Sequence, residues 1–266
     1  MSEHICLQCG AQYPAAAEPP ARCIICEDER QYVRWDGQAW TTPQELRAKY
    51  RNRLESDAGV LGIGMSPSFA IGQRALLAET PEGNVLWDCV PLVTDEAVMA
   101  IRARGGVVAI AISHPHYYSS LVQWSEALGG VPVYLQADDR AWVTNPHSCI
   151  VHWAGEILEL CAGITLIRCG GHFAGGTVLH WRGPAGDVLL SGDILQVTMD
   201  RRHVSFMYSY PNNMPLGPAA INRIMQSLEP FEYQSVLGAF WGRNLLGDGK
   251  NAVATSAARY LAVIRI

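Results

Sequence analysis

The alternation of short apolar stretches with polar, turn-forming residues predicts a body built from many short strands and a few helices. Apolar, β-branched runs bounded by glycine, proline or asparagine indicate strands. Such runs occupy residues 59–65, 70–79, 84–90, 107–112, 131–136, 150–153, 156–161, 165–169, 178–181 and 188–191. The run 107–112, Val-Val-Ala-Ile-Ala-Ile, is apolar throughout, which predicts a buried central strand.

Segments with helix start and stop signals predict helices between and after these strands. They cover residues 44–50, 95–104, 118–128, 217–227 and 250–263. A Thr-Pro pair at 42–43 provides a cap and first turn, and a Gly-Gly pair at 105–106 closes the second helix. The densest basic cluster is interpreted as the solvated face of a helix. It consists of Arg47, Lys49, Arg51 and Arg53.

Length, composition and charge exclude several classes of protein. The chain has 266 residues, 49% apolar and 17% charged, which is typical of a folded protein and not of a disordered one. The net charge of -5 argues against a broad basic surface, so we expect no nucleic-acid partner. The apolar runs have strand length, far below the roughly 20 residues of a membrane span, so we expect no membrane partner. Residues 1–10 lack the pattern of an export signal, which predicts a cytoplasmic protein.

Four of the eight cysteines form two Cys-x2-Cys pairs near the start of the chain, at Cys6, Cys9, Cys23 and Cys26. Two such pairs present four thiolates to one tetrahedral ion, and about 30 residues need such an ion to fold. We therefore predict a metal-binding module over 1–30 and a connecting strand and helix over 31–56. The remaining cysteines lack ligand spacing and are interpreted as small buried apolar residues.

The stretch from Cys6 to Cys26 resembles zinc ribbons and also the rubredoxin-like hairpin of rubrerythrins. The first resemblance implies structural zinc, which is our prediction, and a colourless protein. The second implies iron, a red protein and a redox role. A module of this kind is also a candidate docking site for a protein partner.

Three further motifs carry histidine or aspartate at the ends of predicted strands. They are Ser113-His114-Pro115-His116, the glycine-rich turn Gly170-Gly171-His172-Phe173-Ala174-Gly175-Gly176, and Leu189-Leu190-Ser191-Gly192-Asp193. Two histidines two positions apart on a strand point the same way and can bind one ion. The glycines allow the backbone to turn sharply and to approach a ligand closely.

This ordered set resembles the metallo-β-lactamase superfamily, which includes glyoxalase II and related hydrolases. Its pattern is HxHxDH after a buried strand, then GH, then GD and a final histidine, and the resemblance covers residues 57–266. It implies an α+β fold, a four-layer αβ/βα sandwich with the cysteine module outside it. It also implies that His114, His116 and His172 hold the first metal, which Asp193 bridges or completes.

The departures from that pattern concern the second metal. Tyr118 and Ser119 stand where the family has Asp and His, and the final histidine is absent from 235–242, where Phe240 and Trp241 cannot bind metal. We therefore predict a mononuclear site of three imidazoles and one carboxylate. Zinc suits this ligand set, and iron or manganese is also compatible with it.

The resemblance implies a metal-dependent hydrolase that acts on the ester, thioester, lactone or other acyl bond of a small-molecule substrate. In this interpretation Asp193 binds the metal and accepts a proton, and Tyr117 or Tyr118 donates to a developing oxyanion. Alternatively, the tyrosines pack into the vacated second site. The body is then an inactive or ligand-sensing module with a structural metal. His203 is a candidate for the pocket, and 205–214 for a substrate wall or a packed loop.

Overall fold

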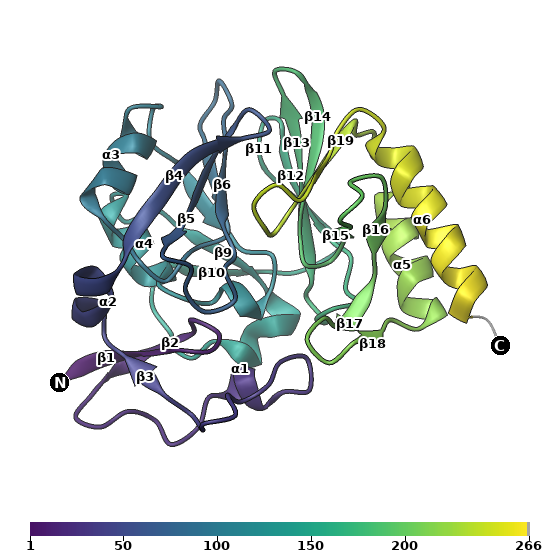
Figure 1. The fold of residues 1–266 in the computed structure, drawn as a ribbon. Coiled ribbons are helices and arrows are strands. Elements are labelled where there is room, and N and C mark those ends of the chain that lie inside the picture. The colour runs from purple at the N-terminus through teal and green to yellow at the C-terminus, as the bar shows by residue number, and fades with distance from the viewer. Residues whose placement is uncertain (265–266) are drawn as a thin grey trace.

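The computed structural model describes residues 1–264, so the last two positions of the predicted 57–266 domain lie outside the described residues. Two β-sheets pack face to face with helices on their outer faces (Figure 1). The first sheet has the order β10 (Ile150–Trp153), β9 (Val133–Gln136), β8 (Ala109–Ala111), β7 (Val85–Trp87), β6 (Ala75–Ala78), β5 (Val60–Ser66) and β4 (Arg51–Asp57). The second has the order β11 (Ile157–Cys161), β12 (Ile164–Arg168), β13 (Thr177–Gly183), β14 (Gly186–Gly192), β19 (Ser235–Gly238) and β20 (Asn244–Leu245). The predicted four-layer sandwich is confirmed.

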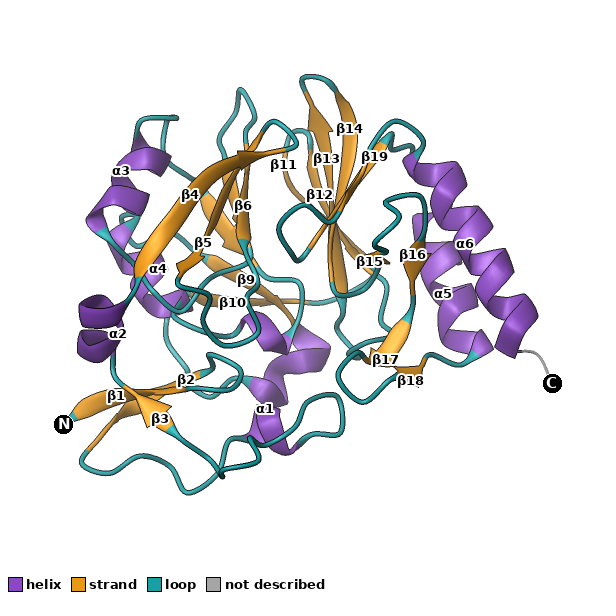
Figure 2. Ribbon diagram, in the orientation of Figure 1, coloured by secondary structure: helices purple, strands orange, loops and turns teal. Residues whose placement is uncertain are grey.

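Helices cover the outer face of each sheet (Figure 2). The helices are α3 (Asp95–Arg102) and α4 (Leu121–Ala127) on the first sheet, and α5 (Pro218–Leu228) and α6 (Gly249–Ile264) on the second. Successive strand residues point to opposite faces, so Leu77 packs toward the helices of the first sheet while Leu76 faces the second sheet. Trp87 and Trp181 meet in this central layer from opposite sheets. Burial of both faces of each sheet explains the continuous apolar runs in the sequence.

The N-terminal residues form a separate small unit below the first sheet in Figure 1. It contains β1 (Ser2–Cys6), β2 (Gln12–Ala16), β3 (Trp40–Thr41) and the short helix α1 (Ile24–Glu27). Because β3 pairs with β1, this unit extends beyond the predicted end at residue 30. The predicted connecting helix is α2 (Pro43–Lys49), which begins with a capping box formed by Thr42 and Glu45.

Three predicted elements differ from the structure. Arg51 and Arg53 lie on edge strand β4 and not on a helix, and Arg53 stacks over Trp241. The strand predicted at 70–79 begins only at residue 75, because Ala70 and the following turn adopt positive φ. The helix predicted at 118–128 begins at Leu121, since the 3-10 turn η1 (Pro115–Tyr117) precedes it.

A polar network, largely buried, ties the two sheets together. Arg74, fully buried before β6, pairs with Asp57 of β4 and donates to Asn244 Oδ1 at 2.7 Å. Asn244 in turn donates to Asp57 Oδ1 at 2.6 Å. Removal of Asp57 would leave the buried Arg74 guanidinium without its counter-charge, so this network fixes the first sheet against β20 of the second.

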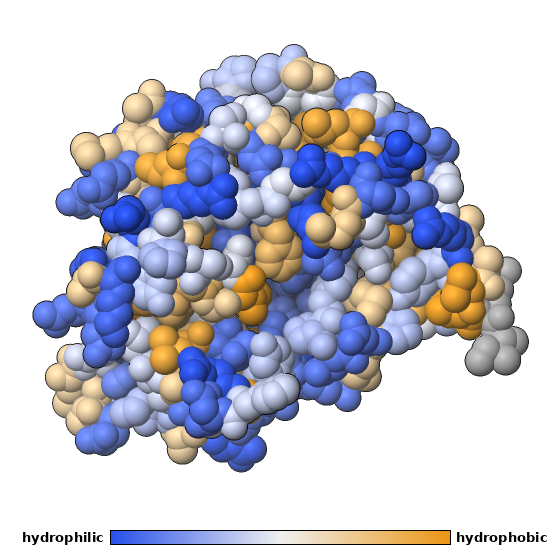
Figure 3. All heavy atoms as spheres, in the orientation of Figure 1, coloured by the Kyte–Doolittle hydropathy of each residue, from blue (hydrophilic) through white to orange (hydrophobic). Residues whose placement is uncertain are grey.

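Polar residues cover much of the face shown in Figure 3, which is hollowed between the two halves of the molecule. Several apolar side chains, drawn in orange, lie around this hollow. Within residues 1–264, none of the helices combines the length and the apolar character that crossing a membrane requires.

Candidate metal centres

The predicted histidines and aspartate come together at one edge of the sandwich. His114 and His116 follow β8 of the first sheet, His172 lies between β12 and β13, and Asp193 follows β14 of the second sheet. One ligand atom from each lies within 4.8 Å of all the others, and all four side chains are buried. The His114 and His172 ring centroids are 5.0 Å apart, which is close enough for both rings to bind one ion.

Gly192 allows the two strand ends to meet. Its φ is +51°, and a Cβ at this position would lie 2.6 Å from the Ser113 hydroxyl oxygen. Any side chain here would both strain the backbone and push β14 away from the end of β8. The glycine before Asp193 is therefore part of the geometry that brings ligands from two sheets together.

A hydrogen-bond chain orients His114. Its Nδ1 lies 2.8 Å from the Ser113 hydroxyl, and Asp88 accepts hydrogen bonds from the Ser113 backbone at 2.7 Å and the Ser113 hydroxyl at 2.8 Å. Burial raises the pKa of Asp88 well above its usual value. Partners of this kind fix the ring orientation of a metal-binding histidine and leave its other nitrogen, Nε2, for the ion. Asp88 was not predicted, although it also leaves a buried strand, β7.

The environment of His116, His172 and Asp193 favours the protonation states that metal binding requires. Burial and the neighbouring His114 lower the pKa of His172 to about 4 and that of His116 well below its usual value. Burial alone would raise the pKa of Asp193, but His114 beside it holds that pKa below its usual value. His172 Nδ1 donates to the Met207 carbonyl at 3.2 Å, and its Nε2 lies 3.3 Å from His116 Nδ1. The site therefore offers neutral imidazole and ionised carboxylate to an ion.

Unpaired buried atoms fit the presence of an ion. His114 Nε2, His116 Nε2 and Asp193 Oδ1 are buried and have no hydrogen-bond partner among residues 1–264. Each such atom costs about 1–3 kcal/mol when it is left unsatisfied. A divalent cation held by His114 Nε2, Asp193 and the facing nitrogens His116 Nδ1 and His172 Nε2 would satisfy nitrogen and oxygen ligands together, and imidazole with carboxylate suits zinc.

Tyr118 and Ser119 stand where the superfamily pattern has second-metal ligands, and Tyr117 precedes them. Tyr117 packs edge-on against His114 at 5.3 Å and donates to the Ala239 carbonyl at 3.4 Å, and Tyr118 lies in the core under the helices. Neither tyrosine lines the cavity beside the histidines, and these contacts favour the packing interpretation over proton donation. Trp241 lies away from the site, over Gly64, whose missing side chain makes room for the indole. Within residues 1–264, no fifth His, Cys, Asp or Glu joins the group.

A small cavity of about 70 Å³ adjoins the ligands His116, His172 and Asp193. Its other walls are Gln31, Ile71, Tyr210, Pro211 and Phe240. The segment 205–214, predicted to be a substrate wall or a packed loop, thus contributes two side chains to the cavity and the carbonyl that orients His172.

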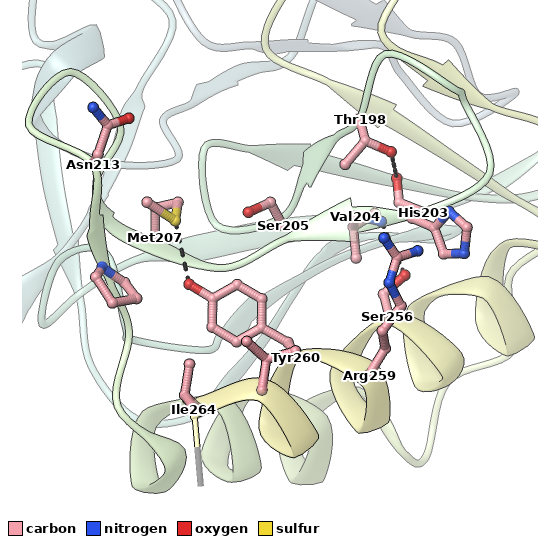
Figure 4. A pocket seen from close by; sticks show the side chains of 12 residues that line it. Thr198, His203, Val204, Ser205, Met207, Asn213, Ser256, Arg259, Tyr260 and Ile264 are labelled. Carbon is pink, nitrogen blue, oxygen red and sulfur yellow. Dashed lines mark hydrogen bonds between the residues drawn. The ribbon is translucent and has the colours of Figure 1, made fainter. Parts of the chain in front are cut away.

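His203 belongs to a different part of the surface. It lies 2.7 Å from Asp200 and lines a larger pocket of about 410 Å³ beside α6 (Figure 4). This pocket runs along β16 (Val204–Ser205) and β17 (Met207–Ser209), where the Tyr260 hydroxyl lies 3.2 Å from the Met207 sulfur. The nearby short strands β15 (Gln196–Val197) and β18 (Met214–Pro215) were not predicted. His203 does not line the cavity beside the candidate ligands.

The four cysteines form the second candidate metal centre. The sulfurs of Cys6 and Cys26 are 3.5 Å apart and those of Cys9 and Cys23 are 3.6 Å apart, close to the roughly 3.8 Å of a tetrahedral zinc–thiolate site. Gln38 Nε2 donates to the Cys6 sulfur at 3.2 Å. These sulfurs are buried among one another, so the residues present fit a four-thiolate ion.

The segment that follows α1 connects the two centres. Arg30 donates to the His172 carbonyl at 3.2 Å, and its guanidinium lies 3.8 Å above the Phe173 ring. Tyr208 and Trp142 flank the same guanidinium. No spacing in the sequence indicated that this segment reaches the histidine site, because the contact joins residues 142 positions apart.

Comparison with known proteins identified a relative by sequence and solved structures of similar fold. No family model matches the chain. The uncharacterized protein YmaE of Bacillus subtilis (strain 168) is 44% identical over 266 residues, which cover 98% of this chain and 96% of YmaE. The crystal structure of VMB-1 aligns with a TM-score of 0.60 at 15% identity, covering 81% of this chain and 99% of that one. The DIM-1 metallo-β-lactamase aligns with a TM-score of 0.59 at 16% identity, covering 80% and 98%.

Proposed function

Because the chain belongs to the same family as YmaE and has the metallo-β-lactamase fold, we propose that it is a metal-dependent hydrolase with a mononuclear site of three histidines and one aspartate. The observation that carries this proposal is the convergence of His114, His116, His172 and Asp193, with unpaired buried donor atoms. The reaction is the hydrolysis of an ester, thioester or other acyl bond of a small molecule. The free, unbridged cysteines support a reducing, cytoplasmic location.

The residues of the site have distinct roles in this proposal. A zinc ion held by them would polarise the substrate carbonyl and make water a nucleophile near neutral pH. Ser113 and the Met207 carbonyl hold the His114 and His172 rings in place. Asp193 has a carboxylate oxygen without a partner within residues 1–264, and we assign it as the proton acceptor. Phe240 and the other apolar walls limit the water that reaches the site.

Metal analysis and a substrate panel test the proposal together. The zinc-loaded protein should hold about two ions per chain and hydrolyse at least one member of a panel of acyl esters and thioesters. The double variant His114→Ala/His172→Ala should lose one ion and the turnover. His203→Ala, which changes a residue outside the cavity, should keep both ions and the turnover. Turnover that survives in the double variant would show that the histidine site does not perform the hydrolysis.

A second candidate is a ligand-binding module without turnover, in which the four-cysteine module docks a protein partner. The small cavity of about 70 Å³ favours it, because a thioester substrate needs more room. Trp35, fully exposed after the last cysteine of the module, is a residue of the type enriched in protein interfaces. A metal-loaded protein that binds small ligands of the panel but hydrolyses none would support this candidate over the first.

A further inference from the structure

Gln31 lines the cavity of the histidine site and carries a buried polar group without a partner among residues 1–264. The residue is 5% exposed, and its Oε1 is buried without a hydrogen-bond partner among residues 1–264. It lines the cavity together with His116, His172 and Asp193. A buried acceptor of this kind is costly unless a ligand or water molecule donates to it.

The backbone around Gln31 is held firmly although its side-chain oxygen is free. Its N–H donates to the Asp28 carbonyl at 2.9 Å, and its own carbonyl accepts from Asn212 Nδ2 at 3.0 Å. Asn212 also donates to the Glu29 carbonyl at 2.8 Å. The Ser209 hydroxyl donates to the Arg30 carbonyl at 3.1 Å. The backbone that carries the Gln31 side chain is therefore held at a fixed place in the wall.

The N-terminal module provides this placement. Residue 31 follows α1, which contains Cys26 of the four-thiolate group. Arg30 anchors the intervening segment through its ion pair with Asp28 at 2.5 Å and its contacts with the loop that carries His172. The module thus holds the part of the cavity wall that Gln31 forms.

We infer that Gln31 is a ligand-positioning residue of the histidine site, contributed by the four-cysteine module. Its Oε1 accepts a hydrogen bond from an N–H or O–H of a small acyl ligand, next to the group that faces the ion. This inference rests on the proposed function, because it requires an ion held by the three histidines and Asp193. It narrows the ligand class to compounds with a hydrogen-bond donor beside the carbonyl or carboxylate.

Two small zinc ligands test the inference by calorimetric titration of the zinc-loaded full chain. Acetohydroxamic acid carries an N–H donor, whereas azide carries none. Gln31→Met should weaken acetohydroxamic acid about five- to tenfold, the effect of one hydrogen bond, and leave azide within about twofold.

Gln12→Met is the matched control, because Gln12 is a buried glutamine of the same module without side-chain partners within residues 1–264, yet it does not line the cavity. It should change neither affinity. The inference is wrong if Gln31→Met weakens both ligands equally or neither, or if the wild type does not bind acetohydroxamic acid. Metal content distinguishes failure of the Gln31 inference from failure of the proposed function. If the proposed function is wrong, His114→Ala/His172→Ala would retain both ions.

Discussion

The two candidate metal centres are alike in size and burial but differ in how the chain builds them. Each gathers four buried ligand atoms within 4.8 Å of one another. The cysteine ligands all come from the first 26 residues, whereas the others extend from His114 to Asp193 and come from two sheets. We therefore expect the first centre to depend on an ion for its local structure, and the second to be assembled by the fold of the whole sandwich.

The surrounding cores support this distinction. The buried apolar cluster of the module consists of the four cysteines together with Ala11 and Ile25. Without an ion, so little apolar surface cannot offset the conformational entropy of ordering the segment. The histidine site lies instead beside clusters on both sheets that contain many more buried apolar side chains than the module does.

Removing the thiolate ligands should have the largest effect. Cys9→Ser and Cys26→Ser should each lose one ion and expose the amides of 2–41 to rapid hydrogen exchange, because this ion supplies most of the stability of the module. The histidine site should keep its ion. Hydrogen exchange with mass spectrometry and elemental analysis measure both outcomes.

The same preparation tests the identity of this ion. We expect a colourless protein with zinc at the four cysteines. Visible absorption from aerobically purified protein that disappears with dithionite would instead show iron and support the redox interpretation.

Removing the imidazole ligands should have a smaller structural effect than removing the thiolates. This result would sharpen the contrast between the cysteine module and the sandwich. His114→Ala/His172→Ala should lose the other ion while the exchange protection of both sheets is retained, since the sheets do not depend on it. Elemental analysis should fall from about two ions to about one. Loss of protection throughout β8 and β14 would show that the sandwich also needs its ion to fold.

The stability of the folded protein should depend on pH through Asp139, a buried residue. Burial raises the pKa of Asp139, which accepts a hydrogen bond from the Gly175 amide in the His172 loop, to about 6. The folded state thus binds the proton more tightly than the unfolded state, so the stability that this group contributes is lost as pH rises from about 4 to about 6. Asp139→Asn should raise the free energy of unfolding by about 1–3 kcal/mol at pH 7 and change it hardly at all at pH 4. Urea denaturation at both pH values measures the difference, and an equal effect at both would contradict it.

The smallest effect is expected from a partner of the ligands. Ser113→Ala removes the hydroxyl that orients His114 and should weaken zinc binding at the histidine site about tenfold, without changing the cysteine centre. Ser125→Ala removes another buried serine hydroxyl, which donates to the Val131 carbonyl away from both centres. Competition with a zinc chelator should separate the two variants. Equal affinities would show that Ser113 does not position the ring.

The sequence allows site residues to be predicted where residues close to them along the chain determine how their side chains are placed. The cysteine pairs and the strand-end histidines are of this kind, and the structure brings each set together. Strand β4 was missed because it is a polar edge strand, on which Arg51 and Arg53 are not distinguished from a helix surface by pattern alone. Asp88 and Gln31 were missed because their contacts form only when distant segments pack, and nothing in their spacing encodes that approach.

The order of the two sheets along the chain determines which ligands a single backbone cleavage would separate. Every strand of the first sheet precedes residue 154 and every strand of the second follows 156, and an exposed turn joins them. A cut in that turn would give one polypeptide with His114 and His116 and another with His172 and Asp193. Neither fragment would own a complete histidine site, so reassembly of the pair would respond to the concentration of the ion. We expect the fold to serve in this sense as a template for a split reporter of the ion that the histidine site binds.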